Sequence, residues 1–196
     1  MKALGLALVI ALVAAAPARA GYKIMYAGEA RAVGKLGLSV TPPNDWNRLG
    51  DKIGRNAESW TLDGLTLNDL SFYAGIADDK TLFRETDRKY HPLPHFQASM
   101  LPPDIVSLFE GSYRVAAGTS LFSVGGVEPA TFAGHPGVHF TYAFTLQDEE
   151  VKRSGEGTGA VIGGKLYLIT FEAPSIYYYE RDAGAYRLLV ASARIN

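Results

Sequence analysis

The sequence predicts an α+β fold, a single domain in which an antiparallel β-sheet is flanked by helices as an α/β/α sandwich. Most of the chain after residue 31 consists of short apolar runs separated by glycine, proline or acidic residues, a pattern typical of strands and turns. Two segments, residues 102–117 and 182–193, instead repeat their apolar residues with helical spacing. Nothing marks a second domain, so residues 32–196 are expected to fold as one unit.

The centre of the sheet is expected at residues 163–171. Gly163 and Gly164 have the composition of a two-residue hairpin turn, in which both residues take a positive φ. The run that follows is apolar on both alternating faces, as in a strand that is covered on both sides. A helix over residues 182–193, with Asp182 as its N-cap, is expected to lie on this sheet.

The other elements follow in chain order. Residues 21–31 lack periodicity and are expected to be a flexible lead-in. Trp46, after the turn at Pro42 and Pro43, is expected to cap the edge of the core, with ligand stacking as the alternative. A helix is predicted to begin at Pro102 and to end at Gly118. Strands are expected over residues 32–40, 58–62, 70–74, 121–124, a short run ending at 132, 138–146 and 151–162, with a short edge at 193–195.

The first twenty residues have the composition of a secretory signal peptide. Lys2 precedes an apolar run from Leu4 to Ala16, and Ala18 and Ala20 are the small residues that a signal peptidase recognises. The run is short for a membrane span, although a retained N-terminal anchor is the alternative. We therefore expect cleavage after Ala20 and a periplasmic or secreted protein.

Composition excludes several kinds of site and partner. The chain has no cysteine, which excludes disulfides, thiolate metal sites and a lipid-modified cysteine. The signal peptide carries two basic residues, so 17 basic and 20 acidic residues remain after its removal, a formal charge of −3. This near balance gives no reason to expect nucleic acid as a partner. With no integral membrane segment after signal removal, the expected partner is an unknown protein or small molecule.

Residues 84–99 are the least regular part of the domain. A run of mixed charges is followed by His91-Pro92-Leu93-Pro94-His95, whose prolines are incompatible with a helix. We expect a long surface loop. Loops of this length are often functional, so a binding role is sought here, with a solvated connection as the alternative.

No motif identifies a catalytic, cofactor-binding or metal-binding residue. The pairs His91/His95 and His135/His139 have a spacing that would place two imidazoles on one metal if they were helical, but neither pair is expected on a helix. No acids or thiols cluster with them, so no metal and no cofactor is expected.

Two further patterns admit more than one interpretation. Residues 155–159 alternate glycine with other residues and resemble a phosphate-binding loop, but they continue into a strand and not a helix. Alternating glycines in a strand favour a bulge or the close approach of another backbone. Three consecutive tyrosines, residues 177–179, cannot all face inward, so at least one ring is expected to be exposed. The exposed ring is either a stacking surface for a carbohydrate or a protein partner. The alternative is that a helix packs two of the rings against the sheet and the third has no function.

The order of these elements resembles that of the PsbP-like (Mog/PsbP) fold family, whose namesake is an extrinsic protein of the photosynthetic oxygen-evolving complex. Three stretches carry the resemblance: Leu38–Trp46 with its two prolines, Pro136–Tyr142, and Gly164–Ile169 followed by a helix and residues 191–195. The resemblance implies an antiparallel sheet between helices, used as a binding or assembly module without catalysis. It carries over no functional residue.

Two functions are therefore expected from the sequence. The first is a periplasmic, non-enzymatic binding or accessory module for an unknown ligand. The alternative is a small periplasmic hydrolase whose site is assembled from distant segments, because catalytic groups meet in space and not in chain order. A cleft that contains a Ser–His or carboxylate pair would favour the hydrolase, and one lined by aromatic residues alone would favour binding.

Overall fold

The computed structural model describes residues 23–50, 53–147 and 149–196, so the predicted signal peptide lies outside the described residues. The helices are α1 (Pro102–Ala117) and α2 (Tyr178–Ala191). One group of strands is β1 (Lys23–Met25), β4 (Trp46–Arg48), β5 (Ala57–Thr61), β6 (Asp69–Ile76), β7 (Phe122–Phe132), β8 (His135–Thr145), β9 (Lys152–Ile162) and β10 (Lys165–Pro174). A second group is β2 (Arg31–Val33), β3 (Leu38–Val40) and β11 (Arg194–Ile195).

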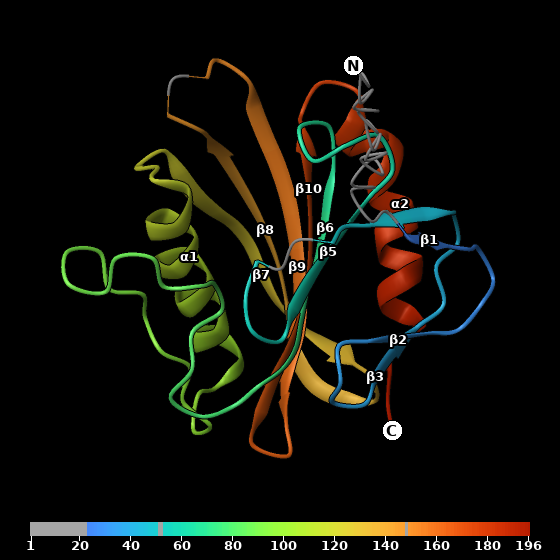
Figure 1. The fold of residues 1–196 in the computed structure, drawn as a ribbon, viewed down its shortest axis with the longest axis horizontal. Helices are drawn as coiled ribbons and strands as arrows, with labels where there is room; N and C mark the ends of the chain where they lie inside the picture. The colour runs from blue at the N-terminus through green and yellow to red at the C-terminus, as the bar shows by residue number, and fades with distance from the viewer. Residues whose placement is uncertain (1–22, 51–52, 148) are drawn as a thin grey trace, which may run out of the picture.

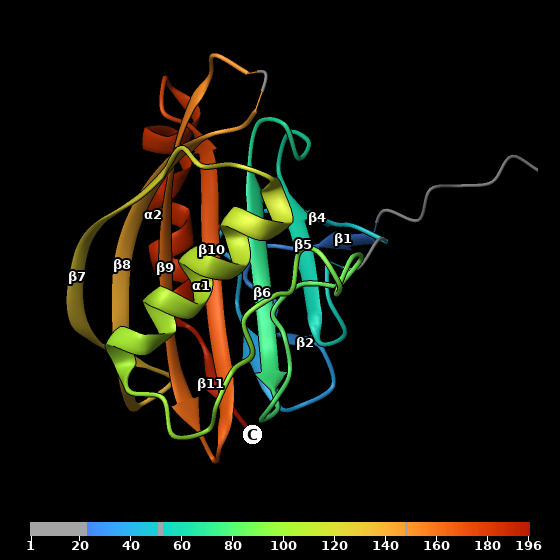
Figure 2. The ribbon, with the colours of Figure 1, turned by 90° about the vertical axis from the view of Figure 1, so that its left-hand side faces the viewer.

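The first group forms an antiparallel eight-stranded sheet in the order β1-β4-β5-β6-β10-β9-β8-β7. Helix α1 covers one face of this sheet and α2 covers the other (Figures 1 and 2). The second group forms a small sheet, β11-β3-β2, which packs on the α2 side. The predicted α+β sandwich is thus confirmed. Among the described residues, no helix is both long and apolar enough to span a membrane.

Strand β10 is central, as predicted. It pairs with β6 on one side and with β9 on the other, and Gly163 and Gly164 form the β9–β10 turn with φ of 57° and 73°. Its alternate residues enter two separate cores: Leu166 and Leu168 pack on the α1 face, whereas Ile169 packs on the α2 face. Coverage on both faces explains why the strand is apolar on both alternations.

The glycines of β9 make room for aromatic rings from β8. The ring of Phe140 lies over Gly157 and that of Tyr142 lies over Gly155, so that a Cβ atom at either glycine would overlap a ring. The predicted close approach is therefore real, but it is made by side chains of the neighbouring strand, and Gly159 alone of the three meets neighbouring backbone.

The N-terminal elements differ from the prediction. Residues 32–40 are not one strand but a hairpin, because Gly34 and Gly37 take positive φ values of 65° and 85° between β2 and β3. Part of the expected lead-in, residues 23–25, is the edge strand β1, and its Met25 is buried in the core. Trp46 is fully buried, which confirms the packing role and rules out ligand stacking.

Helix α2 begins four residues earlier than predicted. Its N-cap is Tyr177, and Asp182 lies inside the helix, so the prediction of Asp182 as N-cap is wrong. Asp182 was predicted as a cap because it precedes an apolar stripe, but its carboxylate instead accepts hydrogen bonds from Arg181 and Asn68. The tyrosine run therefore forms the first turn, with Tyr177 65% exposed.

The region from α1 to β8 follows the prediction with two changes. Gly118 ends α1 with a left-handed φ of 62°. The strands expected on either side of Gly125 and Gly126 are one strand, β7, whose register shifts between Val124 and Val127. The following turn is at residues 133–134, so β8 already begins at His135.

Candidate functional site

The long loop predicted around residues 84–99 extends over residues 77–101 and crosses the α1 face of the sheet beside α1. We call it the crossing loop. It contains no helix or strand beyond one bridge, between Lys80 and Phe96. Leu82 and Phe96 are fully buried in the α1-side core, and Leu93 is nearly so. These apolar anchors hold the loop in place, while Arg84, Arg88 and Lys89 between them are exposed.

Three adjoining hollows open around Phe83 of the crossing loop, and Phe83 lines all of them. The polar pocket, of about 190 Å³, lies between α1 and the sheet and is lined by Asp69, Ser71, Tyr73, Tyr113, Thr170 and Glu172. The hollow that we call the apolar hollow, of about 360 Å³, has apolar walls from Ile53, Phe83, Leu93, Val115 and Ala116 and a polar rim of Arg84, Thr86, Asp87 and His91. The cationic hollow, of about 450 Å³, is lined by Gly54, Arg55, Lys80, Thr81 and Arg84, together with Glu85.

Two carboxyl groups face each other in the polar pocket. Asp69 of β6 and Glu172 of β10 are direct partners in the ladder, so their side chains leave the sheet on the same face. Glu172 Oε1 accepts a hydrogen bond from Tyr113 (2.7 Å) and Oε2 accepts one from Tyr142 (3.0 Å). Asp69 accepts one from the Ser71 hydroxyl (3.0 Å). The pair is thus held by three hydroxyl donors from three elements.

The carboxyl pair retains a proton at neutral pH. Burial, and then the proximity of Asp69, raises the pKa of Glu172 to about 8, against the hydrogen bonds from Tyr113 and Tyr142. Burial likewise raises the pKa of Asp69 to about 6. The buried guanidinium of Arg153 on β9 opposes both shifts without cancelling them. Because the two groups are strongly coupled, the shared proton belongs to the pair.

A second ionic cluster lies on the opposite face of the sheet. Glu156 of β9 is fully buried and accepts hydrogen bonds from Tyr179 (2.7 Å), Arg187 (3.0 Å) and His139 (3.1 Å). Burial alone would raise the pKa of Glu156, but these donors outweigh it and lower the pKa to about 2. The hydrogen bond with Glu156 in turn raises the pKa of His139, whose other nitrogen meets Glu128. Because Tyr179 and Arg187 belong to α2, the cluster links this helix to the sheet.

The histidines do not form a metal site in the described part of the chain. His139 lies between two glutamates, and His95 bonds to Asp79 at 2.8 Å. His91 lines the apolar hollow, and His135 is exposed at the start of β8. No group of three or more potential metal-ligating side chains is found among the residues that the structure describes.

The sequence analysis missed Asp69 and Glu172. The available signal was an acid directly after residues 163–171, the run predicted to be covered on both faces, because a buried carboxyl group is costly unless it is paired or protonated. Glu172 directly follows the apolar run of β10, and Asp69 directly precedes the strand predicted over residues 70–74. Tyr113 lines the pocket and Tyr142 donates to Glu172, and no local pattern in the sequence marks either tyrosine as the partner of an acid.

Comparisons with known proteins identify the fold. No protein-family model and no curated protein matches the chain. Among solved structures, the cyanobacterial PsbP protein (CyanoP) of Synechocystis sp. PCC 6803 matches with a TM-score of 0.54 and 17% identity, over 90% of this chain and 94% of that one. LpqN of Mycobacterium tuberculosis, described as involved in cell envelope biogenesis, matches with a TM-score of 0.36 and 11% identity, over 92% and 87%. The predicted PsbP-like fold is therefore confirmed by the first of these structures, as a likeness of fold alone.

Proposed function

We propose that this chain is a non-enzymatic binding or accessory module that acts in the periplasm or outside the cell and takes its ligand in the polar pocket. The observation that carries the proposal is the composition of that pocket. Aromatic walls from Tyr73, Phe83 and Tyr113 surround a small set of convergent polar groups, an arrangement typical of small-molecule sites. The signal-peptide composition of residues 1–20 supports the location.

The charge state of the pocket narrows the chemistry of the ligand. The carboxyl pair of Asp69 and Glu172 holds one proton, so it can donate one hydrogen bond and accept others. A ligand with hydroxyl or amide groups matches this mixture. The apolar hollow, which shares Phe83 and Ala116 with the pocket, extends the site for a larger molecule.

The same pair supports a hydrolase as the second candidate function. The pKa values of the two neighbouring carboxyl groups lie on either side of neutrality, as those of a general acid and a general base commonly do in hydrolases. In that case Glu172 would be the acid and Asp69 the base. Against this, both oxygens of Glu172 already accept hydrogen bonds from tyrosines, which suits a fixed binding surface better than proton transfer.

Native mass spectrometry of the exported protein tests the binding function. Ala116→Phe fills the pocket from an exposed position of α1, and Ser107→Phe is the matched control, because Ser107 is exposed on the same helix and does not line the pocket. The expected result is a retained small molecule in the wild type and the control that is absent from Ala116→Phe. No retained molecule, or equal retention in Ala116→Phe, contradicts the proposal.

The hydrolase is tested separately with ester, glycoside and peptide substrates. Turnover that is lost in Glu172→Gln but kept in Ser107→Phe would replace the binding function with the catalytic one. Glu172→Gln keeps the shape of the side chain, so its loss of turnover would report on the acid and not on packing.

A further inference from the structure

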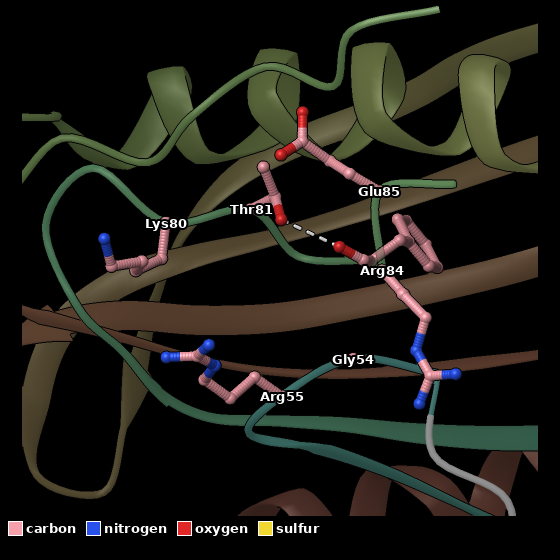
Figure 3. Close-up of a pocket in the computed structure, with 7 residues that line it drawn as sticks. Gly54, Arg55, Lys80, Thr81, Arg84 and Glu85 are labelled. Atoms are coloured by element: carbon pink, nitrogen blue, oxygen red, sulfur yellow. Dashed lines mark hydrogen bonds between the residues drawn. The ribbon is translucent and has the colours of Figure 1, made fainter. Parts of the chain in front are cut away.

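The cationic hollow is built by two segments that are distant in sequence and tightly joined. Gly54 and Arg55 form one side, and residues 80–85 of the crossing loop form the other (Figure 3). The amide of Arg84 donates to the carbonyl of Ile53 (2.9 Å), and the carbonyl of Leu82 lies where a Cβ of residue 54 would be. Glycine is therefore required at position 54, and the close backbone contact fixes the two sides relative to each other.

Three cations line this hollow without a carboxylate partner. Within residues 23–50, 53–147 and 149–196, the side chains of Arg55, Lys80 and Arg84 form no salt bridge and no hydrogen bond, and all three are exposed. Among the described residues, six other arginines each meet a carboxylate, namely Arg31, Arg48, Arg114, Arg153, Arg181 and Arg187, whereas Arg88 and Arg194 form no salt bridge. In a chain where acids outnumber bases, this hollow is a local excess of positive charge.

The acid that lines the hollow does not neutralise it. Glu85 extends toward α1, on the opposite side from the guanidinium groups of Arg55 and Arg84 (Figure 3). Its Oε1 is buried and has no hydrogen-bond partner among the described residues. The Thr81 hydroxyl is used locally, since it donates to the carbonyl of Phe83 at 2.8 Å.

We infer that the cationic hollow binds a multiply charged oxyanion, the chemistry shared by phosphate esters and polycarboxylates. Guanidinium groups bind such oxygens through paired N–H donors, and the Lys80 ammonium adds a mobile point charge. The volume of about 450 Å³ admits the organic part of the molecule as well as its charged end. This inference rests on the proposed function, because Phe83 joins this hollow to the polar pocket and would place the oxyanion at the charged end of the same ligand.

Isothermal titration with pyrophosphate and with citrate, against sodium chloride at matched ionic strength, tests the inference. The variants are Arg55→Gln with Arg84→Gln, Lys80→Gln alone, and Lys35→Gln as an exposed control outside the hollow. The expected result is saturable binding of one or both anions that weakens at least about tenfold in the double variant and is unchanged in the control. Circular dichroism melts should show that all variants fold, because the substituted side chains are exposed.

Vesicles identify the source of the oxyanion. A lipid headgroup is supported if the protein sediments with phosphatidylglycerol vesicles but not with phosphatidylcholine vesicles, and if the double variant does not sediment with either. A soluble ligand is supported if the protein binds the free anion but does not sediment with vesicles. Absence of saturable binding to either anion and to the vesicles, or binding that is indifferent to Arg55 and Arg84, overturns the inference. Ala116→Phe should keep oxyanion binding, because Ala116 does not line the cationic hollow. Failure of the pocket proposal and failure of this inference are therefore distinguishable.

Discussion

Glu172 reaches the hydroxyl of Tyr142 across Gly155, which lies between them in the sheet ladder. Gly155 of β9 pairs with Tyr142 of β8 on one side and with Glu172 of β10 on the other. Because Gly155 has no side chain, the tyrosine ring lies over it and brings its hydroxyl to 3.0 Å from the carboxylate. The alternating glycines that resembled a phosphate loop are thus part of the support for a half-buried carboxyl group.

We predict that Glu172→Gln changes how stability depends on pH. The folded-state pKa of Glu172, about 8, lies above the ordinary value, so between about pH 4.5 and 8 the folded protein binds more protons than the unfolded chain. Wild-type stability therefore falls as pH rises through this window, and the neutral glutamine removes the part of the fall that Glu172 causes; the part due to the raised pKa of Asp69, below about pH 6, remains. Relative to the wild type, the variant should gain stability with a slope of up to about 1.4 kcal/mol per pH unit.

Urea melts at half-unit steps from pH 5 to pH 8.5 measure this difference. The control is Glu180→Gln, at an exposed position of α2, whose melts should follow the wild type throughout. Parallel curves for Glu172→Gln and the wild type would show that the carboxyl pair is ionised in the folded protein at every pH.

The opposite face of the sheet gives a second pH prediction. The pKa of His139 is raised chiefly by its hydrogen bond with Glu156, so the imidazolium stabilises the fold below about pH 6.5 and this contribution is lost as pH rises through the folded-state pKa. His139→Gln should cost about 1 kcal/mol at pH 5.5 and clearly less at pH 9. Guanidinium melts at the two values test this, and an equal cost at both would assign the loss to packing.

The contact between Gly157 and Phe140 predicts a non-additive pair of substitutions. Gly157→Ala should cost about 2 kcal/mol, because its Cβ would overlap the ring, and Phe140→Ala about 3 kcal/mol by opening a cavity. The double variant should cost less than the sum, since the new Cβ enters the space that the ring leaves. Urea melts complete the cycle, and strict additivity would mean that the strands separate to relieve the overlap. Gly184→Ala is the control, because nothing lies within 4 Å of its Cβ position on α2.

The sequence predicted elements whose residues interact locally. Gly163 and Gly164 determine their turn through their own φ values, and Gly118 ends α1 in the same way. The start of α2 was wrong because Tyr177 takes a φ of 76°, which is unusual for an aromatic residue and carries no sequence signal. The fold was predictable because the alternation of apolar and polar residues in strands, and the glycines and prolines of the turns, recur over the whole chain.

The candidate site was predictable only in part. The crossing loop was recognisable from its length and its prolines, which are local properties. The pairing of Asp69 with Glu172 was not, because it depends on the register between two strands a hundred residues apart. The cationic hollow has the same origin, since Arg55 meets Lys80 and Arg84 only when the two segments pack together.

The predicted signal peptide determines the expected mass of the mature protein. Ala18 and Ala20 follow a short apolar run, so export should leave Gly21 as the first residue. Intact-mass measurement of the protein recovered from the periplasm checks this directly. A mass that includes residues 1–20 would indicate a retained anchor, and Ala20→Arg is expected to block cleavage and give that mass as a reference.

The last prediction concerns Asn68, which joins the loop after β5 to α2. Asn68 is fully buried; its Oδ1 accepts hydrogen bonds from the amides of Leu62 (2.7 Å) and Asp63 (3.2 Å), and its Nδ2 donates to the carboxylates of Asp63 (2.9 Å) and Asp182 (3.2 Å). The isosteric change Asn68→Asp replaces the donor with an acceptor that faces two carboxylates.

At pH 7 the new carboxylate of Asn68→Asp would be buried among like charges, and Arg181, which already bonds to Asp63 and Asp182, has little capacity left to neutralise it. We expect a loss of at least about 3 kcal/mol at pH 7. The loss should shrink at pH 4, because a protonated carboxyl group regains one donor in the position of Nδ2. Urea melts at both values measure it against Asn44→Asp, an exposed control that should cost almost nothing. If Asn68→Asp costs as little as Asn44→Asp at pH 7, the two carboxylates do not both face residue 68 and this link between the loop and α2 is not formed as described.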